Sequence, residues 1–118
     1  MMPKNSNYDL EERTKQFAKR VRSFINSVAK SPSNVEDIKQ LIRSSGSIGA
    51  NYIEANESFS KKDFIMRVKI CRKGAKESIY WLDLLEINKP QTDKERQLLI
   101  QESTELMKIF GSIVTKSS

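Results

Sequence analysis

The chain has 118 residues, 37% of them apolar and 31% charged, and its 21 Lys and Arg residues exceed its 15 Asp and Glu residues to give a net charge of +6. This length has room for one hydrophobic core, so we expect a single domain over residues 1–118. The chain has no histidine and one cysteine, Cys71, which excludes an internal disulfide, Ser-His and Cys-His nucleophile pairs and nearly every transition-metal site. We therefore expect no enzyme activity and no cofactor or metal.

The first two helices are predicted over residues 9–30 and 34–57. Acidic residues open the first, at the positive end of the helix dipole. Ser33 and Glu36 have the capping-box spacing expected at the start of the second. The apolar residues recur at spacings of three and four: Leu10, Phe17, Val21, Phe24 and Val28, then Ile38, Leu41, Ile48, Tyr52 and Ala55.

The other two helices are predicted over residues 61–87 and 93–115, with Ser60 and Thr92 as their caps. Their apolar stripes are Phe64, Val68, Cys71, Ala75, Ile79, Leu82 and Leu85, then Leu99, Leu106, Phe110 and Ile113. The connections between the four helices are short, which favours antiparallel neighbours. The sequence thus predicts an all-α fold, an antiparallel up-down-up-down four-helix bundle.

No membrane or secretion segment is evident. The longest apolar run, Ile79 to Leu82, is far shorter than the roughly 20 residues that cross a bilayer. The opening MMPKNSNYDL lacks the apolar stretch of a signal peptide. We expect a cytoplasmic protein with no membrane partner.

A second apolar seam lies on the helix predicted over residues 61–87. It comprises Met66, Ile70, Trp81 and Leu84, at least a third of a turn from the core stripe. One interpretation is a wide core face. The other is a subunit interface in a homo-oligomer, because such a seam would otherwise be exposed.

Small residues interrupt the second helix. Gly46 and Gly49 each cost about 1 kcal/mol relative to alanine, so close packing of another helix should offset them. Gly46 to Gly49 also matches the GxxG clamp of KH domains, but the mixed sheet which that clamp requires is not predicted. A phosphate-binding P-loop is excluded because no Gly-Lys-Ser/Thr follows.

Four polar residues share another side of that helix: Arg43, Ser47, Asn51 and Glu54. Two interpretations fit these residues equally well. They form either a solvated polar face or a structural network that becomes buried in an assembly. In the second case, Arg43 and Glu54 would need charged partners and Asn51 a full set of hydrogen bonds.

The motif Arg43-Ser44-x-x-Ser47-Ile48-x-x-Asn51-x-x-Glu54-Ala55 is followed by Lys62-Asp63-Phe64, Ile70-Cys71 and Glu77-x-x-Tyr80-Trp81-Leu82. In this order and spacing, the motifs resemble the four helix bundle protein family, also known as the 23S rRNA intervening-sequence proteins, over about residues 8–115. The resemblance implies a bacterial four-helix bundle without known catalytic activity that assembles as a ring, commonly a homopentamer. It also implies association with RNA, with DNA or with a nucleic-acid enzyme such as a reverse transcriptase.

Basic residues concentrate on two helices. Residues 9–30 carry a net charge of +3 and residues 58–89 carry +4, whereas residues 90–118 are neutral. One stripe comprises Lys15, Lys19, Arg22 and Lys30; the other comprises Lys62, Lys69, Arg72, Lys73 and Lys76, with Tyr80 at its end. Each stripe is either a solvated helix face or a phosphate-binding surface.

The sequence is compatible with two functions. The first is a non-catalytic oligomeric adaptor that binds nucleic acid through phosphates without reading sequence. The alternative is a protein-only assembly module on which a protein partner docks.

Overall fold

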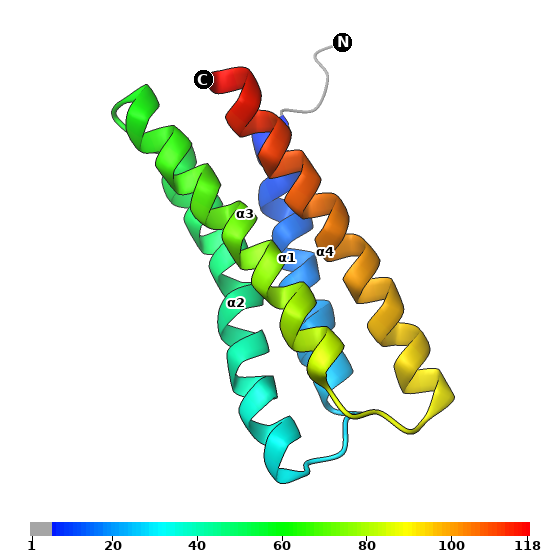
Figure 1. Ribbon diagram of the computed structural model, residues 1–118. Coiled ribbons are helices and arrows are strands. Elements are labelled where there is room, and N and C mark those ends of the chain that lie inside the picture. Colours follow the sequence, from blue (N-terminus) through cyan, green and yellow to red (C-terminus); the bar gives the residue numbers. More distant parts are fainter. Residues whose placement is uncertain (1–5) are drawn as a thin grey trace.

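The computed structural model describes residues 6–118, with side chains from residue 10 onward. Four helices make up this part of the chain: α1 (Ser6–Ile25), α2 (Pro32–Asn56), α3 (Lys61–Leu84) and α4 (Pro90–Ser117). The predicted all-α, four-helix fold is confirmed. Successive helices run in opposite directions, with the α1–α2 and α3–α4 connections at one end and the α2–α3 connection at the other (Figure 1). In the described chain α1 contacts α2 and α4, as does α3, so α1 and α3 are diagonal.

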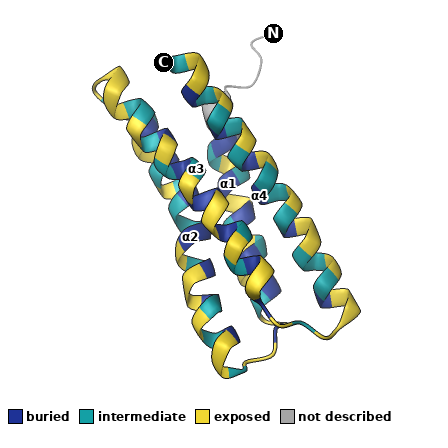
Figure 2. Ribbon diagram, in the orientation of Figure 1, coloured by how far each residue is buried: buried dark blue, intermediate teal, exposed yellow. Residues whose placement is uncertain are grey.

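The core forms where the predicted stripes meet, and buried positions recur along the inner side of each helix (Figure 2). Three predicted stripe residues, Phe64, Ile79 and Ile113, are only half-buried. All the others are buried, and the rings of Tyr52 and Phe110 pack at a centroid distance of 5.5 Å. Most of the stability should come from burying these stripes, because isolated helices of this length are marginal in water.

The α1–α2 connection differs from the prediction. Helix α1 ends at Ile25, not at residue 30, and the Lys30 ammonium donates to the carbonyl oxygens of Ile25 and Val28 at 2.7 and 2.6 Å. Lys30 therefore closes the end of α1 and does not extend its basic stripe. The cap predicted at Ser33 is wrong, because Ser31 caps α2 and Pro32 takes the first helical position, where its missing N–H costs nothing.

Helix α3 starts as predicted, and the Ser60 hydroxyl accepts from the Asp63 N–H at 3.0 Å. It ends at Leu84, however, rather than at residue 87. The side chain of Asn34 takes up both backbone polar groups of Glu86, so the helix gains nothing by continuing. The predicted Thr92 cap is also wrong, because α4 begins at Pro90 and Thr92 is buried inside it.

Small groups bring α2 and α3 together. A Cβ added at Gly74 would lie 3.2 Å from the Ser44 carbonyl oxygen and 2.8 Å from Ser47 Oγ. One turn further along α3, the buried hydroxyls of Ser44 and Ser78 are hydrogen-bonded at 2.9 Å. The contact between α2 and α3 is thus close and partly polar. On the α1 side, Gly49 packs against Thr14 in the same way.

Candidate nucleic-acid interface

Positive charge gathers where α3 packs beside α4. A shallow hollow of about 750 Å³ is lined there by Met107 and by five cationic side chains, which we call the basic face: Lys69, Arg72, Lys73, Lys76 and Lys108. Lys69 also lines a second hollow of about 560 Å³ at the start of α3, together with Lys61 and Lys62. The predicted α3 stripe therefore lies along one continuous side of the molecule.

The basic face is not neutralised from within the bundle. No Asp or Glu side chain lines either hollow, and no ion pair involves its five cations in the part of the chain that the structure describes. Arg72 is half-buried and its Cδ lies close to Gly111, which fixes its stem against α4. Cations held together without counter-charges favour an anionic ligand.

Two cations of these hollows, Lys61 and Lys108, are absent from the predicted stripe. Lys61 is the first residue of α3. Lys108 belongs to a segment with no net charge, and only the packing of α4 beside α3 brings it to the basic face. No pattern within α4 alone could have found it.

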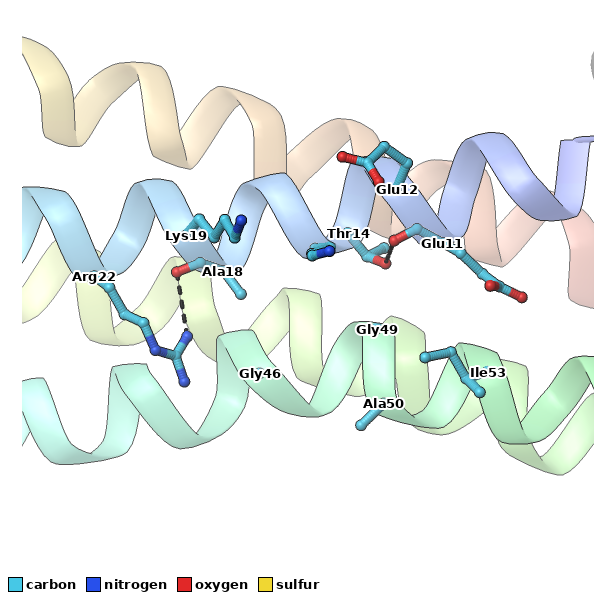
Figure 3. Close-up of a pocket in the computed structure, with 11 residues that line it drawn as sticks. Glu11, Glu12, Thr14, Ala18, Lys19, Arg22, Gly46, Gly49, Ala50 and Ile53 are labelled. Atoms are coloured by element: carbon cyan, nitrogen blue, oxygen red, sulfur yellow. Dashed lines mark hydrogen bonds between the residues drawn. The ribbon is translucent and has the colours of Figure 1, made fainter.

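The predicted α1 stripe lies on the opposite side of the bundle. Lys15, Lys19 and Arg22 line a groove of about 620 Å³ between α1 and α2, which we call the α1–α2 groove. Figure 3 shows Arg22 reaching from α1 toward α2 while its Nη1 donates to the Ala18 carbonyl oxygen at 3.3 Å. Glu11 and Glu12 line the same groove, so its charge is mixed. The structure therefore does not join the two stripes into one surface.

The face between α1 and α4 carries ion pairs that the sequence did not suggest. The Arg13 guanidinium donates to both carboxylate oxygens of Glu102, at 2.8 and 2.9 Å, and to Glu105 at 2.9 Å. The hydrogen bonds that Arg13 donates to Glu102 are the main reason that the pKa of Arg13 lies above its ordinary value. This face is internally neutralised and is a poor candidate for an anionic ligand.

Cys71 has the environment of a structural thiol. Its Sγ donates to the Ile48 carbonyl oxygen at 3.3 Å, and burial raises the pKa of the thiol to about 12. A thiol in this state is a poor nucleophile at neutral pH. Within the described residues, no cluster of three or more His, Cys, Asp or Glu could hold a metal ion. No helix in residues 6–118 is long and apolar enough to cross a membrane.

Comparison with known proteins identifies the relatives of this bundle. The family model described as "23S rRNA-intervening sequence protein" matches residues 6–112. The chain belongs to this family. A crystal structure of a protein with unknown function, from the S23 ribosomal protein family of Bacteroides thetaiotaomicron VPI-5482, is 32% identical. The similarity covers 89% of this chain and 97% of that chain, with a TM-score of 0.74. No curated protein matches.

Part of the α2 motif by which the chain resembles the intervening-sequence proteins lies where α2 packs against α3. On α2, Ser47 lies against Gly74, and Asn51 Oδ1 accepts from the Arg67 guanidinium of α3 at 2.9 Å. Arg43 and Glu54 lie one turn before Ser47 and one turn after Asn51, on the same side. Both are exposed, and among the described residues neither has an ion-pair partner. Of the four polar residues predicted as a network, Asn51, which also donates to the Ser47 carbonyl oxygen, is the one with a hydrogen bond to α3 among the described residues.

The second apolar seam borders those polar residues. Ile70 lies one turn before Gly74 and Trp81 two turns after it, and both are half-buried. Met66 and Leu84, at the two ends of the seam, are 53% and 43% exposed, and Met66 also lines the hollow at the start of α3. We call the seam, together with Arg43, Ser47, Asn51 and Glu54, the α2–α3 face. The structure thus joins two features that are separate in the sequence.

Proposed function

We propose that this chain is a non-catalytic accessory protein that binds nucleic acid through its basic face. One observation carries the proposal: five cationic side chains from two helices share a hollow that contains no carboxylate. The protein would act in the cytoplasm, where the buried thiol of Cys71 stays reduced. Lys15, Lys19 and Arg22 would add to the attraction from the far side, but Glu11 and Glu12 weaken their field.

Phosphate contacts should dominate this binding. Each phosphate that a lysine or arginine neutralises releases counterions, so the logarithm of affinity should fall with the logarithm of salt concentration by roughly 0.7 to 0.9 per contact. All four helices of the described chain pack in one bundle, and none projects from it to enter a groove. Sequence discrimination should therefore be weak. The family name refers to 23S rRNA, which makes RNA the first probe to use.

Fluorescence anisotropy with short RNA, duplex DNA and RNA-DNA hybrid probes at two salt concentrations tests the proposal. Lys69→Glu with Lys73→Glu should weaken binding to all probes alike and flatten the salt dependence. The matched control is Lys89→Glu with Lys94→Glu, which changes the net charge equally. Both control positions are exposed at the start of α4, where acidic residues are favourable. Binding that is absent at low salt, or equal in the two variants, would contradict the proposal.

A second proposal concerns assembly, and the α2–α3 face favours it. This face combines partly exposed apolar side chains with two charges, Arg43 and Glu54, that lack partners in the described chain. A second copy would cover the former and supply partners for the latter. We infer a ring-like homo-oligomer, with the pentamer that the family resemblance implies as the expected state. If nucleic-acid binding fails while assembly holds, a protein-only scaffold becomes the better description, with a protein such as a reverse transcriptase as its partner.

A further inference from the structure

Phe59 is the most exposed large apolar residue of the described chain. It lies in the α2–α3 connection, directly before the Ser60 cap, and its exposed fraction of 102% means that its ring contacts nothing else in the bundle. A residue at this position usually packs against the fourth residue of the helix, here Phe64. Phe64 instead packs against the core, and the phenyl ring of Phe59 stays in water. An unpacked aromatic ring at a tip suggests a ligand that the ring contacts.

Cationic side chains begin immediately after this ring. Lys61 and Lys62 line the hollow at the start of α3 together with Lys69, whereas Glu57 and Asp63 do not line it. From there one row of α3 continues at helical spacings of three and four: Lys62, Met66, Lys69, Lys73, Lys76 and Tyr80. A second exposed aromatic residue therefore ends the row.

The length of the row suits a short strand. Helix α3 rises about 1.5 Å per residue, so Lys61 and Tyr80 are separated by roughly 28 Å. Nucleotides stacked as in B-form DNA rise about 3.4 Å each, so roughly eight of them would span the row. A groove of positive charge combined with aromatic side chains is the usual means of binding unpaired strands, because every base has a face on which a ring can stack.

We propose that Phe59 and Tyr80 stack on unpaired bases of a single-stranded nucleic acid whose phosphates lie along the lysine row between them. This inference rests on the proposed function and narrows it to single strands. In a duplex the faces of the bases are already stacked on one another, so these rings would find no partner. Single strands of RNA and of DNA both offer unpaired bases and phosphates, and comparing the affinities of RNA and DNA probes distinguishes them.

The test measures anisotropy of 12-nucleotide RNA and DNA strands and of the matching duplexes. Phe59→Ala should weaken binding of the single strand by about five-fold to a hundred-fold and leave duplex binding unchanged. Phe59→Trp should retain the affinity, because it keeps a stacking surface. Leu98→Ala is the control. Leu98 is also exposed, but it lies one turn before Glu102, on the side of α4 that contacts α1. Probes with 2-aminopurine at one end should show fluorescence quenching that is lost in Phe59→Ala or Tyr80→Ala.

Three results would overturn the inference. If Phe59→Ala binds the single strand as the wild type does, while the Lys69 and Lys73 reversals abolish binding, the proposed function stands and the stacking role fails. If no probe binds the wild type, both fail. If Phe59→Ala instead changes the mass measured by light scattering, the ring contacts a second copy of the chain. An RNA strand bound more tightly than its DNA equivalent would identify RNA as the preferred ligand.

Discussion

The side chain of Asn34 on α2 holds the backbone of Glu86 in the α3–α4 connection. Asn34 Nδ2 donates to the Glu86 carbonyl oxygen and Oδ1 accepts from the Glu86 N–H, both at 2.9 Å. Nδ2 also donates to the Ala29 carbonyl oxygen at 2.9 Å, and Asn34 is only 1% exposed. A single buried amide therefore ties together the two connections at this end of the bundle.

Asn34→Ala should lower the free energy of unfolding by about 2 to 4 kcal/mol. The substitution leaves three backbone groups without their partner, and each unpaired buried group costs about 1 to 3 kcal/mol. Urea unfolding followed by circular dichroism measures the change. Ser33→Ala, at the exposed neighbouring position, should be nearly neutral. Equal stability of Asn34→Ala and the wild type would show that water replaces the amide.

Glycine substitutions should separate positions of close helix contact from open ones. A Cβ at Gly46 meets only Arg22 Nη2, at 3.8 Å, so Gly46→Ala should stabilise the fold by about 0.5 to 1 kcal/mol through helix propensity. At Gly74 the Cβ would meet the Ser44 carbonyl oxygen at 3.2 Å, so Gly74→Ala should destabilise by about 1 to 3 kcal/mol. Urea midpoints that shift in the same direction for both variants would contradict this assignment.

The Cys71 thiol should make stability fall at alkaline pH. Burial raises its pKa to about 12, whereas a cysteine in the unfolded chain loses its proton near 8.5. Between these values the unfolded state has released the proton and the folded state has not, so the free energy of unfolding falls as pH rises and is unaffected below about pH 8.

Urea titrations from pH 8 to 10.5 measure this effect. The fall in the free energy of unfolding with rising pH should be shallower for Cys71→Ala than for the wild type, by up to about 1.4 kcal/mol per pH unit. The folded protein should also react slowly with a thiol reagent at neutral pH. Rapid labelling without unfolding would mean that the thiol is accessible.

The assembly proposal predicts that charges on the α2–α3 face dissociate the oligomer. Leu84→Glu should shift the mass from light scattering toward the monomer, because a buried carboxylate there would lack a partner. Trp81→Glu should do the same, although Trp81 also packs partly against the core. Leu98→Glu is the control at 45% exposure. A wild-type protein that is monomeric at micromolar concentration would refute the proposal.

Much of the fold was predictable because each helix carries its own periodic signal. The stripe containing Phe17, Val21 and Phe24 is buried as expected. Helix ends were harder, because they depend on residues distant in the sequence. Asn34 ends α3 from α2, and the Arg96 guanidinium adds a hydrogen bond to the Leu82 carbonyl oxygen at 3.2 Å. No local rule at Leu85 could reveal either contact.

The candidate site was predictable only one helix at a time. The sequence predicted the line of cations along α3, but it did not predict that Lys108 of α4 lies beside them. The α1 stripe is also a line of cations along one helix, yet it lies on the opposite side of the bundle, where Glu11 and Glu12 line the same groove. Likewise, helical spacing identified the Trp81 seam and the Asn51 side of α2 separately, and tertiary contacts alone join them.

The hydrogen bond between Ser44 and Ser78 has a consequence for the register of the α2–α3 hairpin. Sliding α3 by one turn along α2 would place the Ser78 hydroxyl opposite Leu41 or Ile48 of α2 and break its hydrogen bond with Ser44. Each hydroxyl would then keep only the carbonyl oxygen of its own helix, Leu41 for Ser44 and Gly74 for Ser78. Purely apolar helix surfaces tolerate such slips because one methyl group replaces another. A buried polar pair disfavours such slips, just as a buried Asn fixes the register of a coiled coil. These two small hydroxyls therefore select one alignment of the hairpin and, with it, the alignment of every side chain on its outer surface.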